Sequence, residues 1–201
     1  MEYVTKKEVK PWKVKFDELM SKIRPLLKEE GITFNYDLVG SAKRNLVIRN
    51  HNKGFDCDYQ IYIIKNKNKL SPKNIKLLFV KLINIYKSNE FDNCEDRTTS
   101  IKLKYIDTNE SKIIFSYDIV IMKYEGKMKV IKKVDEEKNI YDFITIKDYS
   151  KYNELIKKIK GKVLWNRLRE LYYNRKINNK NNAKSFQIFY ECVIVVANKI
   201  L

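Results

Sequence analysis

The sequence contains few of the residues that form cross-links or tight turns. Its 201 residues include three cysteines, Cys57, Cys94 and Cys192, which are widely spaced and form no Cys-x-x-Cys pair. An odd number of cysteines in this arrangement argues against a disulfide framework or a structural zinc site, and it favours a reducing, cytoplasmic location. With five glycines and three prolines in the whole chain, we expect long helices and strands with few tight turns.

Long hydrophobic runs are also missing. No apolar run reaches the roughly 18–20 residues that a membrane-spanning helix needs. Residues 1–15 alternate lysines with apolar side chains and lack the continuous apolar stretch of a signal peptide. We therefore expect no membrane association. Hydrophobic residues still make up 44% of the chain, which is enough to bury a core and excludes wholesale disorder.

Acidic residues are the minority among the charges. The chain has 42 lysines and arginines against 25 aspartates and glutamates, a net charge of +17. A lysine-rich solvated surface is the simplest explanation, but the coding bias that enriches lysine also enriches glutamate and does not account for the sign. Basic surfaces attract polyanions such as nucleic acids and nucleotide phosphates. Residues 151–180 alone carry a net charge of +8. This charge could bind the triphosphate of a nucleotide or an RNA or DNA acceptor, or it could have no ligand at all.

The periodicity of apolar residues predicts an α+β fold. Alternation of apolar and polar residues indicates strands over 32–39, 55–64, 98–106, 112–122 and 127–133. Apolar residues at helical spacing indicate helices over 11–30, after Ser71-Pro72, and from about residue 150 onwards, with a last helix over 184–201. Strands in adjacent pairs with helices grouped around them are typical of α+β domains. We therefore predict one domain over residues 1–148 and a C-terminal helical unit over residues 149–201.

Three aspartates in apolar strands point to metal chemistry. Asp56 and Asp58 stand two residues apart in the predicted strand 55–64, so both side chains project from one face while Cys57 projects from the other. Two adjacent carboxylates repel each other unless a cation lies between them, and hard ions such as Mg²⁺ prefer oxygen ligands. Asp118 is a lone charge in another apolar strand. If the two strands are neighbours, the three acids suit a pair of metal ions about 3.5–4 Å apart.

A Gly-Ser turn at the end of the strand 32–39 supplies a complementary feature. Gly40 allows the backbone to turn sharply and to approach a ligand closely. Ser41 begins a short predicted helix and offers its hydroxyl and free amides to phosphate oxygens. Lys43 and Arg44 follow at once, and both suit neutralisation of phosphate charge.

Gly-Ser, then Asp-x-Asp, then a single strand aspartate resembles the nucleotidyltransferase superfamily of DNA polymerase beta. The resemblance covers residues 12–122 and implies a mixed sheet with flanking helices. It implies that Asp56, Asp58 and Asp118 bind two Mg²⁺ ions, which Mn²⁺ can replace, and that Gly40 and Ser41 bind the triphosphate of an incoming nucleotide. The interval between the Gly-Ser turn and the Asp-x-Asp pair is long for this family.

The C-terminal half is similar to helical units of the poly(A)-polymerase-like and cyclic-oligonucleotide-synthase-like branch. There a Ser-Phe-x-x-x-x-Glu pattern, matched here by residues 185–191, places the serine near the triphosphate. The resemblance thus adds Ser185 to the phosphate ligands. The lysine that usually accompanies it is replaced by Tyr172, which leaves Arg169, Lys176 or Lys184 to substitute.

These features predict an enzyme that transfers a nucleoside monophosphate from an NTP to an acceptor hydroxyl and releases pyrophosphate. Asp118 is assigned to the metal ion that activates the acceptor, with a share of general-base work. The acceptor stays open among an RNA end, a protein hydroxyl, a second nucleotide and a small molecule. The alternative is a basic nucleic-acid-binding module that keeps the fold without turnover. A third option, an antibiotic-modifying transferase, would need an acidic cleft and is disfavoured by the basic C-terminal region.

Overall fold

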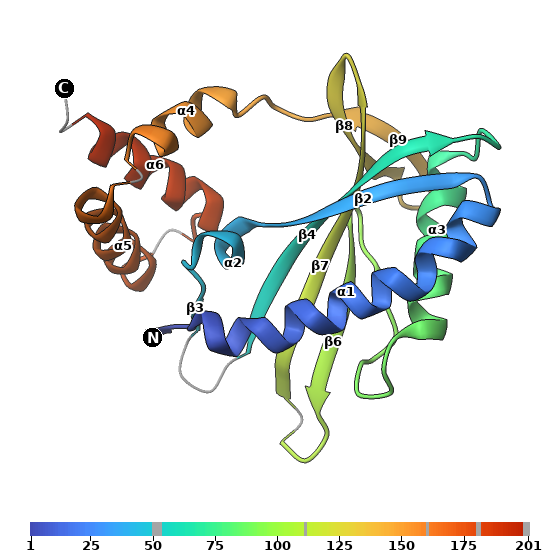
Figure 1. The fold of residues 1–201 in the computed structure, drawn as a ribbon, viewed down its shortest axis with the longest axis horizontal. Helices are drawn as coiled ribbons and strands as arrows, with labels where there is room; N and C mark the ends of the chain where they lie inside the picture. The colour runs from blue at the N-terminus through green and yellow to red at the C-terminus, as the bar shows by residue number, and fades with distance from the viewer. Residues whose placement is uncertain (50–53, 111, 160, 180–181, 199–201) are drawn as a thin grey trace. The chain divides into compact units, whose positions relative to one another are not determined.

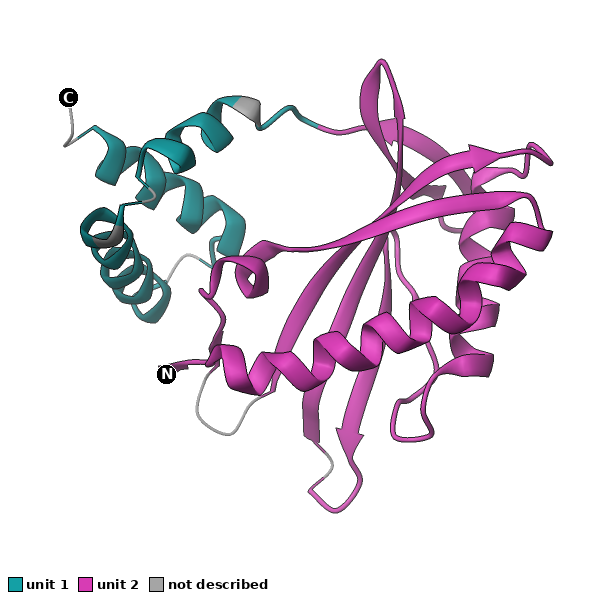
Figure 2. Cartoon of the chain, viewed as in Figure 1, with its two compact units in different colours: residues 1, 147–201 teal, residues 2–146 magenta. Residues whose placement is uncertain are grey.

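The structure is a computed structural model that describes residues 1–49, 54–110, 112–159, 161–179 and 182–198. It divides into two compact units, residues 2–146 and residues 147–201 together with Met1 (Figure 2). His51, which the sequence predicts to be a loop residue, lies outside the described residues. Among the described helices, none combines the length and the apolar composition that crossing a bilayer requires.

The larger unit begins with a long helix. A two-residue strand β1 (Glu2–Tyr3) precedes α1 (Lys6–Glu29) and pairs with β3 (Ile48–Arg49). The sequence predicted that Pro11 opens the helix, and this is wrong: α1 begins five residues earlier because Thr5 and Glu8 form a capping box. Pro25 lies inside the helix, and α1 continues past it to Glu29, close to the predicted end at residue 30.

A mixed sheet forms the centre of this unit (Figure 1). Its strand order is β2-β4-β7-β6-β5. β8 pairs with the C-terminal end of β7, at Met122–Glu125, and with β9. β4 and β7 are parallel, whereas every other pair in the described sheet is antiparallel. The strands are β2 (Ile32–Val39), β4 (Phe55–Asn66), β5 (Glu95–Asp96), β6 (Ser100–Asp107), β7 (Lys112–Glu125), β8 (Lys127–Asp135) and β9 (Ile140–Thr145).

The predicted α+β class is therefore confirmed, and most predicted strands lie within two or three residues of the observed ones. β9 was not predicted. The connection between the parallel strands β4 and β7 runs through α3 (Pro72–Tyr86), which begins as expected at Ser71, whose hydroxyl accepts the N–H of Asn74. Parallel strands require such a crossover, because a short hairpin can join only antiparallel neighbours.

Alternation along β4 separates the two faces of the sheet. Cys57 and Tyr59 are fully buried, and the Tyr59 ring stacks on Phe16 of α1 with centroids 3.6 Å apart. The residues that alternate with them, Asp56 and Asp58, project from the opposite face. On β7, Tyr117 follows the same rule and donates its hydroxyl to the carbonyl of Trp12 in α1. One face of the sheet thus packs on α1, and the other face carries the acids.

The smaller unit is helical, as predicted. It contains α4 (Ser150–Lys158), α5 (Lys162–Ile177) and α6 (Ser185–Ala197). The segment of α6 is mostly apolar, and it is a helix, as the sequence predicts for residues 184–201. Tyr172 of α5 is buried, with its ring 6.3 Å from that of Phe189, so it belongs to the core. Tyr190 stacks on Tyr149 at a centroid distance of 5.2 Å.

Candidate functional site

The fold brings the three predicted aspartates together. Asp58 of β4 lies directly opposite Asp118 of β7 in the parallel ladder, and Asp56 lies opposite Ser116. One carboxylate oxygen from each of Asp56, Asp58 and Asp118 lies within 4.8 Å of the other two. The central position of β7, paired on one edge with β4 and on the other with β6, is what places Asp118 here.

The start of β4 is held close to β7 by a glycine. A Cβ atom at Gly54 would lie 2.3 Å from the carbonyl oxygen of Ile113 and 2.4 Å from that of Ile114. No larger side chain fits at those distances without movement of the β7 backbone. Gly54 therefore permits the close approach of the two backbones where the parallel pairing of β4 and β7 begins. This pairing sets the register of the aspartates.

Two other aspartates, Asp107 and Asp135, lie in polar, turn-like stretches of the sequence instead of within an apolar strand, and their surroundings differ from those of Asp118. Asp107 accepts the backbone N–H groups of Asn109 and Glu110, and Asp135 accepts that of Lys138. Both carboxylates therefore stabilise turns, as their polar neighbours in the sequence suggested.

Crowding of the carboxylates perturbs Asp58. Burial, followed by the negative charges of Asp56 and Asp118, raises the pKa of Asp58 from 3.8 to about 6, against the opposing effect of Lys102 and Arg44. A carboxyl group that is desolvated and faces two others is stabilised when a cation joins them. The donor set is all oxygen, which suits a hard divalent ion. These three residues therefore fit a divalent metal ion.

The Gly-Ser turn lies directly against the aspartates. β2 ends at Val39, which pairs with Asp58, and the next residue, Gly40, has φ of +64°. A Cβ atom at Gly40 would lie only 2.1 Å from Oδ2 of Asp58. Both the positive φ and this contact require glycine. The turn and the carboxylates that the sequence predicted as one site are thus neighbours in space.

The short helix α2 (Gly40–Arg44) carries the other predicted phosphate ligands of this unit. Ser41 is its second residue and is partly buried. The guanidinium of Arg44 donates to the carbonyl of Gly40 at 2.9 Å, which holds its charge beside the turn. Lys43 borders a hollow of about 740 Å³ on the α1 side, together with Lys10, Lys13 and Tyr59. Tyr59 and Asp58 project from opposite faces of β4, so the hollow that Lys43 borders is on the face opposite to Asp58.

Lys102 and Ser100 of β6 are site residues that the sequence analysis missed. Lys102 lies opposite Asp118 in the β6–β7 ladder and donates to its Oδ2 at 2.9 Å. The hydroxyl of Ser100 donates to Oδ1 of Asp118 at 3.4 Å. The description of Asp118 as a lone charge is therefore corrected: it has an ion-pair partner on the neighbouring strand. The available signal was the pair of lysines, Lys102 and Lys104, two residues apart in the predicted strand 98–106. The sequence does not show which acid each lysine contacts, because this depends on the register between β6 and β7.

The remaining predicted ligands belong to the smaller unit. Ser185 is the first residue of α6, and its hydroxyl accepts a hydrogen bond from Lys176 of α5 at 2.9 Å. Lys184 is the exposed N-cap residue of α6, and Arg169 lies on α5 and is partly buried. Lys176 and Ser185 are thus brought together. Contact of these residues with a triphosphate stays a prediction.

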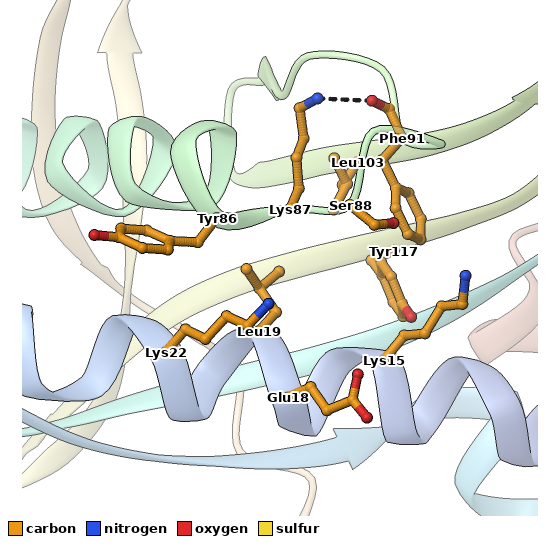
Figure 3. A pocket seen from close by; sticks show the side chains of 10 residues that line it. All are labelled: Lys15, Glu18, Leu19, Lys22, Tyr86, Lys87, Ser88, Phe91, Leu103 and Tyr117. Atoms are coloured by element: carbon orange, nitrogen blue, oxygen red, sulfur yellow. Dashed lines mark hydrogen bonds between the residues drawn. The ribbon is translucent and has the colours of Figure 1, made fainter.

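The face of the sheet that packs on helices has a second, smaller hollow (Figure 3). It measures about 150 Å³ and lies between Lys15 and Leu19 of α1, the end of α3, and Tyr117 of β7. In Figure 3, Lys87 closes one side by donating to the carbonyl of Phe91 at 2.7 Å. Because Tyr117 and Asp118 project from opposite faces of β7, this hollow is separate from the aspartates.

Comparison with known proteins identifies the fold through structure alone. No family model and no curated protein sequence matches the chain. The GTP-bound form of Vibrio cholerae DncV matches with a TM-score of 0.60 at 15% identity, covering 95% of this chain and 59% of that protein. CdnC of E. coli MS115-1 with ATP matches with a TM-score of 0.57 at 16% identity, covering 99% of this chain and 63% of CdnC.

A third match is DncV described as a cyclic AMP-GMP synthase in complex with the linear intermediate pppA(3′,5′)pG, with a TM-score of 0.53 at 13% identity. It covers 89% of this chain and 51% of that protein. This chain thus spans between about half and two thirds of the length of these solved proteins. The likeness confirms the mixed sheet with flanking helices that the sequence predicted. The chain therefore shares its fold with DncV and CdnC.

Proposed function

We propose that this protein is a magnesium-dependent nucleotidyltransferase that transfers a nucleoside monophosphate from an NTP to an acceptor hydroxyl. The observation that carries the proposal is the convergence of Asp56, Asp58 and Asp118 within 4.8 Å beside the Gly40 turn. Residues 1–148 would form the catalytic domain and residues 149–201 a helical unit that contributes Arg169, Lys184 and Ser185 to the triphosphate.

The reaction uses the chain's own groups for binding, orientation and proton transfer. The turn at Gly40 and Ser41 offers backbone amides and a hydroxyl to the triphosphate, and Arg44 adds positive charge beside it. Two Mg²⁺ ions held by the three carboxylates would supply neutralisation of the phosphate charge and acidification of the acceptor hydroxyl. The acceptor oxygen forms a bond to the α-phosphorus, the bond to the bridging oxygen of the β-phosphate breaks, and pyrophosphate leaves. Asp118 would act as the general base and accept the proton of the acceptor hydroxyl.

Among the acceptors, a second nucleotide has the best support. The solved structures with this fold contain GTP, ATP or a linear dinucleotide intermediate, which favours NTP as donor and a nucleotide hydroxyl as acceptor. An RNA end is the acceptor that the strongly basic composition favours instead. We infer a reducing, cytoplasmic location from the cysteine pattern, in which the free thiols Cys57, Cys94 and Cys192 would stay reduced.

The test is incubation of the purified chain with each α-labelled NTP and with Mg²⁺ or Mn²⁺, alone, with a second NTP, and with total RNA. We expect labelled product together with stoichiometric pyrophosphate. Absence of pyrophosphate with every NTP and every acceptor would refute the proposal. Labelled RNA rather than a labelled small nucleotide would assign the acceptor to RNA.

Asp56→Ala separates the enzyme from the alternative, a basic nucleic-acid-binding module. An enzyme of this type loses pyrophosphate release by at least about 100-fold, because one oxygen ligand and one negative charge leave the metal site. A module that only binds polyanions keeps or gains affinity for RNA. Asp107→Ala is the matched control, since it removes an equal charge from a strand end outside the carboxylate group and should retain transfer activity.

A further inference from the structure

Lys102 is the cation that the folded chain itself supplies to the carboxylates. Its Nζ donates to Oδ2 of Asp118 at 2.9 Å, and the side chains of Lys102 and Asp118 are only 16% and 25% exposed. The pairing is fixed by the backbone, because the two residues are directly opposite in the β6–β7 ladder. Lys102 also acts on Asp58, whose pKa it lowers through its positive charge. One ammonium group therefore offsets part of the negative charge of Asp118 and of Asp58.

We propose that Lys102 is an intrinsic counter-cation that competes with a divalent ion for Asp118, so that the nucleotide-free protein binds the metal weakly at this carboxylate. An ion ligated by Asp118 must share that carboxylate with the ammonium or displace it, and like charges at this separation repel. The inference rests on the proposed function only in its choice of metal. It concerns the affinity of the carboxylate group for a cation, which is measurable without any turnover.

The neighbouring lysine on the same strand shows why the effect is specific. Lys104 stands two residues from Lys102 and lies opposite Ser116, and its ammonium pairs with Glu95 instead of with the three aspartates. A change at Lys104 removes the same charge from the same strand but leaves the partner of Asp118 in place. Lys104→Met is therefore a matched control for Lys102→Met.

The experiment is a titration of metal-free protein with Mn²⁺, followed by the loss of the EPR signal of free Mn²⁺, without nucleotide. We expect Lys102→Met to bind Mn²⁺ about tenfold more tightly than the unmodified chain, because a like charge beside Asp118 no longer repels the metal ion. Lys102→Arg, which keeps the charge, and Lys104→Met should stay near the unmodified affinity. In the Asp118→Asn background, Lys102→Met should tighten Mn²⁺ binding much less than in the unmodified background, because the shared carboxylate is gone and only the action of Lys102 on Asp58 remains.

Equal or weaker Mn²⁺ binding by a folded Lys102→Met would overturn the proposal, and weaker binding would show that Lys102 instead orients Asp118 as a ligand. Absence of Mn²⁺ binding in every variant also overturns it. Far-UV circular dichroism and the thermal midpoint without metal check that each variant folds. If Lys102→Met does not fold, Lys102→Gln replaces it, since it removes the charge but keeps a hydrogen-bond donor, and it must show the same increase in Mn²⁺ affinity.

The outcomes separate this inference from the function proposed above. Tightening by Lys102→Met without any pyrophosphate release from the unmodified chain would retract the nucleotidyltransferase and keep the counter-cation. Pyrophosphate release with unchanged Mn²⁺ affinity in Lys102→Met would do the reverse.

Discussion

Replacing Asp58 with asparagine should make the metal-free protein more stable at neutral pH while abolishing its response to metal. Burial and the charges of Asp56 and Asp118 raise the pKa of Asp58 from 3.8 to about 6. Between these two pH values the folded chain holds a proton on Asp58 that the unfolded chain has released. The free energy of unfolding therefore falls as the pH rises through this window, and stability is greatest on its acid side.

The size of the effect follows from the shift. About two pH units correspond to a loss of about 3 kcal/mol once the pH exceeds the folded pKa. Asparagine resembles the protonated carboxyl in shape and stays neutral, so Asp58→Asn avoids this loss. For a chain of this length, where about 1 kcal/mol moves the thermal midpoint by about 2–4 °C, we expect an increase of about 6–12 °C at neutral pH.

Thermal unfolding in a chelating buffer, followed by circular dichroism, measures the difference. The midpoints of the two proteins should coincide near pH 4, separate progressively between about pH 4 and pH 6, and stay fully separated above about pH 6. Addition of Mn²⁺ at about 100 times its dissociation constant should stabilise the unmodified chain by about 2.7 kcal/mol and should leave Asp58→Asn almost unchanged. A variant that is no more stable than the unmodified chain at neutral pH, or that differs from it equally at all pH values, would refute the reasoning.

Two further substitutions test the turn and the first helix. Gly40→Ala should lose transfer activity and stability, because its Cβ would lie 2.1 Å from Oδ2 of Asp58 at a φ of +64°. Gly126→Ala is the control, because Gly126 has φ of +65° but no atom within 4 Å of an added Cβ. It should show only the backbone strain of about 1–3 kcal/mol. Equal losses in both would exclude the contact as the cause. Thr5→Ala should lower the free energy of unfolding by about 1 kcal/mol, because the helix cap is lost, and it should keep transfer activity. Urea denaturation measures this change, and an unchanged free energy of unfolding would show that the capping box contributes nothing.

The predicted elements agree best with the structure where the signal is local. The strand over 32–39 has the predicted bounds because alternation of apolar residues is a property of a short segment, and Ser71-Pro72 marks the start of α3 for the same reason. The start of α1 was misplaced, since the reciprocal hydrogen bonds of Thr5 and Glu8 extend the helix ahead of Pro11. β9 was missed because its six residues depend on pairing with β8.

For the site, the amino-acid sequence by itself determined which residue types are present and which face of a strand each occupies. Period-two alternation is enough to put Asp56 and Asp58 on one side and Cys57 on the other. Only the tertiary structure decided which strands are neighbours: the parallel β4–β7 ladder places Asp118 opposite Asp58, and the β6–β7 ladder gives Asp118 its partner Lys102. Strand pairing joins segments far apart in the chain, so its register depends on the packing of the whole sheet and not on any single stretch of residues.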